Sequence, residues 1–511
     1  MKILILFLCV AFSRAKIEKA RVGPGYDCPY CQPEQVHISF GEKTNDIVAT
    51  WSTFNDTGES RAQFGVGQMD QEASGRSTLF VDGGPERRAQ FIHRVLMKDL
   101  KHDTTYVYHV GSEYGWSEEF WFKTPPAGEN WVVRAAIFGD MGNKNAHALS
   151  YLQDEAQRGH FDLIIHVGDF AYDMHDDNAR VGDQFMRQVQ PLAALVPYMA
   201  CPGNHEEAYN FSNYRARFSM PGGAENLYYS YDVGPVHFVS ISTEPYYFLQ
   251  YGLKVLENQF RWLHRDLSEA NREENRAKRP WIVLYGHRPM YCSNSDDIDC
   301  SFEYTRKGLP IWGSYGMEPL LKQYGVDLVV WAHEHSYERL WPVYDEQVYN
   351  GSLHQPYTNP GAPVHIVTGS AGCQERIDPF VSKPPAWSAF RSTDYGYTRF
   401  YAHNNTHIHI EQVDVDLKGE VIDSFWLIKH RHHPFHNLAP VHVVTGSAGC
   451  QEGRDHFKRK PHKWSAFRSQ DYGYTRFKAF NKTHINMEQV SVDLDGQVID
   501  SFWLIKDRSE L

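Results

Sequence analysis

The sequence predicts an α/β layered domain that follows a smaller all-β domain. From Trp131 onward, short apolar segments alternate with longer polar segments of helical periodicity, and this alternation is typical of α/β domains. Before that point, residues 36–125 contain only short runs in which apolar and polar residues alternate, the pattern of half-buried strands in a β-sandwich. At the C-terminal end, one long segment occurs twice.

The N-terminal domain is expected over residues 33–125, with a structural role. Its strand-like runs include Asp46–Trp51 and Thr105–Val110, and Trp51 is placed to enter the core. The segment Leu100–Tyr106 resembles the tyrosine-bearing turn of fibronectin type III domains. Thr124–Gly128 contains two prolines and a glycine, and we interpret it as the linker to the next domain.

The second domain is expected over residues 132–429. Two polar segments, Ala146–Gly159 and Leu256–Ala270, have the periodicity of helices. The apolar segments have the length and β-branched content of buried strands. These expected strands are Ala135–Phe138, Leu163–Val167, Leu195–Met199, Val236–Ile241, Trp281–Tyr285 and Val326–Trp331.

The segment 362–429 returns as 439–506. Cys450 follows Cys373 by 77 residues, and Trp464 follows Trp387 by the same interval. Two copies are too few for a solenoid, and one sheet has room for only one set of strands. We therefore expect one copy to complete the domain and the other to be appended, displaced or exchanged between chains. The pair could also derive from alternative exons that are included together.

The N-terminus has the pattern of a secretory signal peptide over residues 1–15. Lys2 precedes the apolar run Ile3–Phe12, and Ser13–Ala15 fits a small-x-small cleavage site. An uncleaved anchor is the alternative, but the run is too short to cross a bilayer. A secreted chain also fits five sequons, which are candidate glycosylation sites. They begin at Asn55, Asn210, Asn350, Asn404 and Asn481.

Cysteine usage agrees with an oxidising compartment. Removal of the signal peptide leaves seven cysteines, so at least one is free or paired between chains. Cys292 and Cys300 flank a short acidic loop and are a candidate disulfide. Cys28 and Cys31 have the spacing of a redox motif, but in a secreted chain without a thioredoxin-like pattern we favour a structural role.

The composition is that of a globular protein. Hydrophobic residues make up 42% and aromatic residues 14% of the 511 residues, enough for two or three domains with sizeable cores. The formal net charge of -12 gives no electrostatic reason to expect a nucleic acid or an anionic membrane as a partner. An anionic ligand would therefore have to be held by local side chains.

Polar motifs follow several of the expected strands. The apolar run Leu163–Val167 ends at Gly168, and Asp169 and Tyr172 come next. One Gly-Asp pair is usually only a turn with a helix cap. However, ligands of open α/β sheets bind at the carboxyl ends of the strands, and four further motifs occupy such positions. They are Phe138–Gly142, Cys201–Glu206, Tyr285–Pro289 and Trp331–His335.

If the strands are parallel, these five motifs meet at one edge of one sheet. That edge would carry aspartate, asparagine, tyrosine and histidine side chains, a set that favours a two-metal site over a tetrahedral structural zinc site. His333 and His335 would point to the same side of an extended segment and could bind neighbouring metals. A tyrosine ligand favours a strongly acidic metal such as ferric iron.

The ordered set GDMG, GDFAY, GNHE, GHRP and AHEHSYER resembles the purple acid phosphatases, within the calcineurin-like metallophosphoesterases. The resemblance implies a metallophosphoesterase sandwich preceded by the β-sandwich of the long plant and animal forms. It also implies that Asp169 bridges the metals and that His205 contacts phosphate and assists the leaving group. The implied ferric ligands are Asp140, Asp169, Tyr172 and His335. The implied ligands of a divalent ion (zinc, iron or manganese) are Asp169, Asn204, His287 and His333.

The function that the resemblance implies is that of a secreted binuclear acid phosphatase. It would hydrolyse small phosphate monoesters by attack of a metal-bound hydroxide, in the extracellular space or the lysosomal lumen. A homodimer is a further expectation. Two alternatives stay open: a nucleotide pyrophosphatase or phosphodiesterase that uses the same site, and a catalytically inactive secreted binding protein.

Two departures from the family pattern affect the site. Ala332 stands where the family usually has glycine, and the loop 291–300 has none of the histidines found there in plant-type enzymes. Protonation of the leaving group would therefore depend on His205 or on another group. Arg288, Tyr337 and Arg339 lie beside the motifs, and a role near the substrate and a packing role are both open.

Overall fold

The fold is taken from a computed structural model, which describes residues 28–296, 298–310, 314–430, 443–449, 454–460, 465–481 and 484–505. The expected signal peptide (residues 1–15) and Cys450 lie outside these ranges. The chain divides into two compact units, Met1–Asn437 and Leu438–Leu511. None of the described helices is both long enough and apolar enough to cross a membrane.

Residues 34–123 form a sandwich of two antiparallel sheets. One sheet contains, in order, β1 (Glu34–Phe40), β2 (Ile47–Thr53), β6 (Ala89–Met97) and β5 (Arg76–Val81). The other contains β4 (Gln71–Ser74), β3 (Arg61–Gly65), β7 (Thr105–Ser112), β8 (Gly115–Trp116) and, paired with β7, β9 (Phe120–Lys123). Trp51 is buried and stacks on His93. The Tyr106 hydroxyl accepts a hydrogen bond from the Lys101 N–H at 3.0 Å, as in the tyrosine corner of β-sandwich domains.

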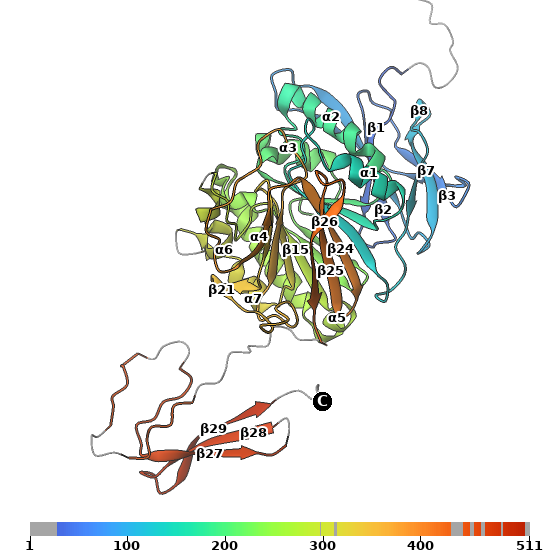
Figure 1. Ribbon diagram of the computed structural model, residues 1–511. Coiled ribbons are helices and arrows are strands. Elements are labelled where there is room, and N and C mark those ends of the chain that lie inside the picture. Colours follow the sequence, from blue (N-terminus) through green and yellow to red (C-terminus); the bar gives the residue numbers. More distant parts are fainter. Residues whose placement is uncertain are drawn as a thin grey trace, which may run out of the picture. The chain divides into compact units, whose positions relative to one another are not determined.

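Two mixed sheets form the second domain (Figure 1). The six-stranded sheet has the order β12 (Tyr198–Cys201), β11 (Leu163–Val167), β10 (Val133–Phe138), β24 (Gly396–Asn404), β25 (His407–Asp414), β26 (Glu420–Ile428). The seven-stranded sheet has the order β13 (Tyr229–Val233), β14 (Val236–Ser240), β15 (Trp281–Tyr285), β18 (Leu328–Trp331), β22 (Val364–Thr368), β19 (Tyr337–Leu340), β23 (Ser388–Ser392). Short hairpins are formed by β16 (Gly308–Leu309) with β17 (Ser314–Tyr315) and by β20 (Val343–Tyr344) with β21 (Gln347–Val348).

The expectation of a single sheet edge is therefore wrong, because the motif-bearing strands belong to two sheets. β10, β11 and β12 are parallel neighbours in one sheet, and β14, β15, β18 and β22 are parallel neighbours in the other. The sheets share one core, in which Phe238 of β14 contacts Phe400 of β24. Buried strands of both sheets have the same apolar composition, so the sequence pattern does not reveal which strands pair.

Helices cover the outer faces of the sandwich. The odd-numbered residues of β15 join the shared core, while Ile282 and Leu284 pack with α4 and α7 on the other face. The helices are α1 (Leu149–Gln157), α2 (Asp176–Ala193), α3 (Ala208–Arg217), α4 (Leu253–Ala270), α5 (Glu273–Lys278), α6 (Tyr304–Lys307) and α7 (Glu318–Gln323). The strand expected at Leu195–Met199 is shifted, because β12 begins at Tyr198, after Pro197, and continues to Cys201.

A buried ionic contact joins the β-sandwich to the second domain. The Arg217 guanidinium lies 2.8 Å from Asp183 Oδ1 and donates to Gln35 Oε1 of β1 at 3.0 Å. Arg88 of the sandwich pairs with the other oxygen of Asp183 at 2.5 Å. Because the side chains of Asp183 and Arg217 are each 1% exposed, each needs its partner to remain charged. This contact fixes the β-sandwich in place.

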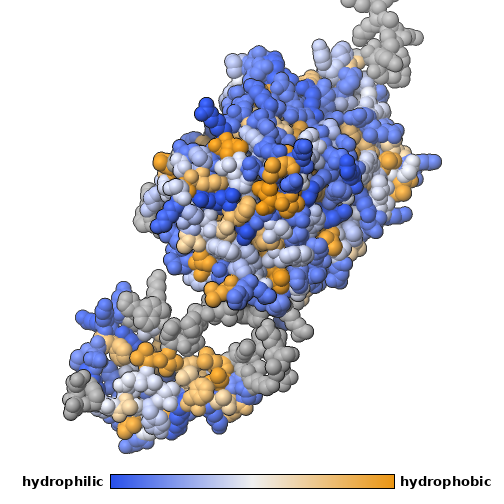
Figure 2. Space-filling view, in the orientation of Figure 1, coloured by the Kyte–Doolittle hydropathy of each residue, from blue (hydrophilic) through white to orange (hydrophobic). Residues whose placement is uncertain are grey.

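The first copy of the repeat supplies β22 through β26 and so lies in both sheets. In the second unit, the second copy forms a three-stranded antiparallel sheet of β27 (Gly473–Ala479), β28 (His484–Ser491) and β29 (Gln497–Ile505). Some of its apolar side chains are exposed where their equivalents in the first copy are buried, and hydrophobic residues are visible on its surface (Figure 2). Phe400 is 0% exposed, for example, whereas Phe477 is 63% exposed.

Candidate metal centre

The carboxyl ends of the parallel strands of both sheets meet at one place, and the polar motifs gather there. The loops after β10, β11 and β12 contribute four of the residues expected from the sequence. These are Asp140, Asp169, Tyr172 and Asn204. The loops after β15 and β18 contribute the other three. These are His287, His333 and His335. The centre therefore lies between two sheets.

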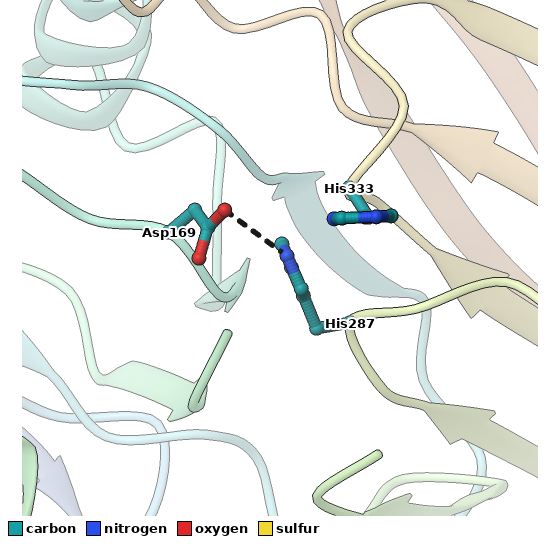
Figure 3. A group of neighbouring side chains, drawn as sticks. All are labelled: Asp169, His287 and His333. Atoms are coloured by element: carbon teal, nitrogen blue, oxygen red, sulfur yellow. Dashed lines mark ion pairs between the residues drawn. The ribbon is translucent and has the colours of Figure 1, made fainter. Parts of the chain in front are cut away.

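Asp169 lies in the middle of one group of donors. One ligand atom from each of Asp169, His287 and His333 lies within 4.8 Å of the others (Figure 3). His287 Nε2 is 3.1 Å from Asp169 Oδ2 and 3.1 Å from Asn204 Oδ1. Asp169 and His287 are buried, so their polar atoms have little access to water.

A second group lies around Tyr172. Its hydroxyl is 3.1 Å from Asp140 Oδ1 and 2.8 Å from His335 Nε2. Burial, followed by the charge of Asp140, raises the pKa of Tyr172 well above its ordinary value. A phenol in this environment ionises only if a strongly acidic cation replaces its proton. This group is thus suited to a ferric ion.

The ring nitrogens of two histidines are oriented by backbone carbonyls. His287 Nδ1 lies 2.8 Å from Val167 O, and His335 Nδ1 lies 2.9 Å from Arg376 O. A carbonyl oxygen can only accept, so each Nδ1 carries a proton and the Nε2 of a neutral ring presents its lone pair to the cluster. At His287, Nε2 faces oxygens of Asp169 and Asn204. Burial lowers the pKa of His287, but the charge of Asp169 raises it to about 9, so a positive charge is favoured among these atoms. A metal ion that replaces the Nε2 proton would supply that charge, and the donor set fits one.

Several of these residues adopt left-handed backbone conformations. The φ angles are 57° for Asp140, 52° for Asp169, 49° for Tyr172 and 74° for His333. Such φ values are unfavourable for residues other than glycine and often mark functional sites. The expectation that His333 and His335 lie in an extended segment is wrong, because β19 begins only at Tyr337. The turn directs His333 toward Asp169 and His335 toward Tyr172.

The pKa values of the two central carboxylates are shifted in opposite directions. Burial raises the pKa of Asp140 to about 7. Burial acts in the same direction on Asp169, but the nearby charges of His287 and His205 hold its pKa below the ordinary value. Environments that separate the pKa values of neighbouring carboxylates are typical of functional sites.

His205 borders the cluster and is held by carboxylates. Its Nδ1 lies 2.7 Å from Asp173 Oδ1, and its Nε2 lies 3.9 Å from Asp169 Oδ2. Burial alone would lower the pKa of His205, but Asp169 and Asp173 raise it to about 10. The imidazole ring lies 4.3 Å from the Tyr172 ring, measured between centroids. The ring is thus fixed at the edge of the donor set.

Other residues around the centre were not assigned a role from the sequence. Glu206 accepts hydrogen bonds from backbone N–H groups of both the β11 and β12 loops. Asp378 accepts from the His335 N–H at 2.6 Å, and Asp299 Oδ2 lies 2.6 Å from His333 Nε2. Glu206 ends the Cys201–Glu206 motif and Asp173 follows Tyr172, so their positions give a usable signal, whereas Asp299 and Asp378 lie outside the motifs.

Two pairs of cysteines form disulfides in the described residues. Cys292 is joined to Cys300, and Cys28 is joined to Cys31. Cys201 and Cys373 are buried and free. The Cys373 sulfur lies 3.6 Å from His335 Nδ1, so the first copy of the repeat also contributes to the surroundings of the centre.

Comparisons with known families cover the chain from the β-sandwich to the second copy. Residues 133–337 match the family model described as calcineurin-like phosphoesterase. Residues 33–124 match the purple acid phosphatase N-terminal domain. Residues 362–424 and 439–501 each match the iron/zinc purple acid phosphatase-like protein C model, so both copies of the repeat keep the family pattern.

Individual relatives agree with these matches. Acid phosphatase type 7 of Danio rerio is 56% identical over 79% of this chain and 93% of its own, and the Homo sapiens protein of that name is 52% identical over 78% and 92%. Purple acid phosphatase PPD1 from yellow lupin has a similar fold, with a TM-score of 0.66, 24% identity and coverage of 78% of this chain and 75% of its own. The α/β sandwich with an all-β N-terminal domain is thereby confirmed, and the chain belongs to the purple acid phosphatase family of the calcineurin-like phosphoesterases.

Proposed function

We propose that this protein is a binuclear-metal acid phosphatase that hydrolyses phosphate monoesters. The observation that carries the proposal is the convergence of His287 Nε2 with oxygens of Asp169 and Asn204, beside the Tyr172, Asp140 and His335 group. Asp169 belongs to the first group, and its charge acts on Asp140 and Tyr172 of the second, so it is suited to bridge two ions. The family that the chain belongs to implies a binuclear centre of this kind.

Each group of donors suits a different ion. Asp140, Tyr172 and His335 would hold ferric iron together with Asp169. Asn204, His287 and His333 would hold zinc, iron or manganese on the other side of Asp169. When bound, such a pair of ions supplies Lewis-acid activation of water and of the phosphate oxygens.

His205 is placed to manage the proton of the leaving group. Asp173 accepts a hydrogen bond from Nδ1 at 2.7 Å, which leaves Nε2 directed toward the side of Asp169. A protonated Nε2 can donate to the ester oxygen as the P–O bond breaks, and Asp173 keeps the ring in that orientation. Glu375 Oε1, 3.8 Å from Nε2, adds negative charge that favours the protonated ring.

The visible spectrum of the purified, iron-loaded protein tests the proposal, beside a Tyr172→Phe variant. We expect a broad visible band that disappears in the variant while the fold is retained. A colourless protein with two bound metals would indicate a different metallophosphoesterase chemistry, and a protein without metals would contradict the proposed centre. Parallel assays with monoester and diester substrates distinguish a monoesterase from a phosphodiesterase or pyrophosphatase.

We further propose that the chain functions in the extracellular space or the lysosomal lumen. The disulfides Cys28–Cys31 and Cys292–Cys300 support this, since disulfides persist in oxidising compartments. Of the five sequons, Asn210 is the least suited to glycosylation because it is only half-exposed within α3 and accepts a hydrogen bond from Arg215. The other four, Asn55, Asn350, Asn404 and Asn481, are exposed. Mass spectrometry of the secreted protein, before and after deglycosylation, tests both points.

A further inference from the structure

In each of the three histidines of the centre, one ring nitrogen is hydrogen-bonded to an oxygen atom of a neighbouring group. The oxygen atom differs in kind between the three rings. For His287 and His335 that oxygen is a backbone carbonyl, reached by Nδ1. For His333 it is the Asp299 carboxylate, which lies 2.6 Å from Nε2.

The proton between His333 and Asp299 is placed by the chemistry of their neighbours. Arg288 Nη1 lies 2.8 Å from the same Asp299 oxygen and 2.9 Å from His333 Nε2. A guanidinium can only donate, and a carboxylate oxygen can accept from two donors at once. The Asp299–His333 distance is the shortest of the three, and a carboxylate oxygen can only accept, so we assign the proton to His333 Nε2 and have Asp299 accept from both His333 and Arg288. The Arg288–His333 contact is then a close approach of two donors on one carboxylate oxygen, not a hydrogen bond. His333 then keeps the lone pair of Nδ1 for another partner.

Asp299 is held rigidly in this position. It opens a short helical turn, Asp299–Ser301, next to Cys300, whose disulfide with Cys292 closes the loop. Arg288, which pairs with Asp299, is itself fixed by the buried Glu244 at 3.1 Å, and its guanidinium lies 4.4 Å from the centre of the Tyr247 ring. The side chains of Asp299 and His333 are 23% and 13% exposed, so water competes weakly for their hydrogen bond.

We propose that Asp299 is a positioning residue that fixes the tautomer and orientation of His333, so that Nδ1 binds the divalent ion. This inference rests on the proposed function, because it assumes a metal on the side of Asn204 and His287. A carboxylate that accepts from the second nitrogen of a metal-bound histidine aligns the ring and makes it a better ligand. The loop that lacks the histidines of plant-type enzymes thus contributes to the centre through an acid.

Metal affinity provides the direct test. In the full-length holoprotein, Asp299→Asn should weaken binding of the divalent ion, measured by competition with a chelator, by roughly 10–100-fold. The iron content and the visible band should not change, because Asp299 acts on His333, on the side of the divalent ion. Glu303→Gln is the matched control: this acid pairs with Arg306 and Lys307, and its loss should leave both affinities as in the wild type.

A double-mutant cycle separates an effect through His333 from an independent one. If Asp299 acts through this ring, the variant Asp299→Asn with His333→Ala should bind the divalent ion as weakly as His333→Ala alone. A further 10-fold loss in the double variant would overturn the inference, as would unchanged affinity in Asp299→Asn. Loss of both metals, together with a lower unfolding midpoint of the metal-free variant, would show a merely structural role. A wild-type protein that binds neither metal would instead refute the proposed function.

Discussion

The carboxylate of Glu206 accepts a hydrogen bond from the backbone N–H of Asp169 at 2.9 Å. It also accepts from the N–H of Phe170 at 3.0 Å and from that of Gly203 at 2.8 Å. One buried side chain therefore joins the loop after β11 to the loop after β12. Glu206 thereby fixes the positions of Asp169 and Asn204, which lie on these two loops, relative to each other.

Replacement of Glu206 should disturb the centre without unfolding the protein. Glu206→Gln puts an amide N–H₂ group where a carboxylate oxygen accepts, so at least one backbone N–H loses its partner. We expect kcat/KM and divalent-ion affinity to fall by about 10–100-fold, measured by steady-state assay and metal analysis. The neighbouring Glu207, which accepts from the Tyr251 hydroxyl, provides the control Glu207→Gln. Equal behaviour of the two variants would contradict the role of Glu206.

Removal of His205 should affect poor leaving groups more than good ones. We expect His205→Ala to lower kcat about 10²–10⁴-fold for an alkyl phosphate, and less for a nitrophenyl phosphate, whose leaving group needs no proton. Metal content should remain that of the wild type, since this side chain is not among the proposed ligands. Equal losses on both substrates would mean that His205 does not protonate the leaving group.

The contact between the two domains should contribute strongly to stability. Asp183→Ala leaves the guanidinium groups of Arg88 and Arg217 without their shared carboxylate. Loss of one member of a buried ion pair costs about 3–5 kcal/mol, and we expect the free energy of unfolding in urea to fall by this amount. Arg158→Ala, at an exposed pair with Asp154, should change it by less than about 1 kcal/mol. A small effect of Asp183→Ala would show that the domains are held by other contacts.

Acid should destabilise the β-sandwich through His93. Burial, reinforced by Arg94, lowers the pKa of His93 from 6.5 to about 4. The unfolded chain therefore takes up the proton first, and stability is lost as the pH falls from 6.5 toward 4, by about 1.4 kcal/mol per pH unit. His93→Gln removes the titrating group, so its free energy of unfolding should depend less steeply on pH in this window. Parallel curves for the two proteins would exclude His93 as the cause.

The repeat provides a matched pair of substitutions. Phe400→Ala removes a fully buried ring from β24 and should cost about 3–5 kcal/mol in the free energy of unfolding of the first unit. Phe477, its equivalent in β27, is 63% exposed, and Phe477→Ala should change stability by no more than about 0.5 kcal/mol. Thermal unfolding followed through activity measures both. A large loss of activity from Phe477→Ala would show that the second copy supports the catalytic domain.

Much of the centre could be predicted because its residues directly follow apolar runs that the sequence identifies as strands. Asp140, Asp169 and His287 each follow an apolar run that forms a strand, and those runs became β10, β11 and β15. The division of these strands between two sheets could not be predicted, because pairing depends on contacts between distant segments that look alike in composition. Asp299 was missed for a similar reason, since it reaches His333 from a loop 34 residues away.

The two copies of the repeat show the same limit of prediction from local sequence patterns. Tyr397 and Tyr474, or Phe400 and Phe477, are the same residue types at equivalent positions, so no local pattern distinguishes them. The two copies differ in strand pairing: β24 of the first copy pairs with β10 and so completes the six-stranded sheet. The turn at His333 could not be predicted either, because a left-handed backbone conformation at a histidine has no sequence signature.

The distribution of the donors over two sheets has a consequence for assembly. Asp169 and Asn204 belong to one sheet, and His287 and His333 to the other, so a metal held between them cross-links the two layers much as a disulfide would. An intermediate with undocked sheets therefore cannot contain a formed centre, and binding of the metal favours the docked arrangement of the two layers.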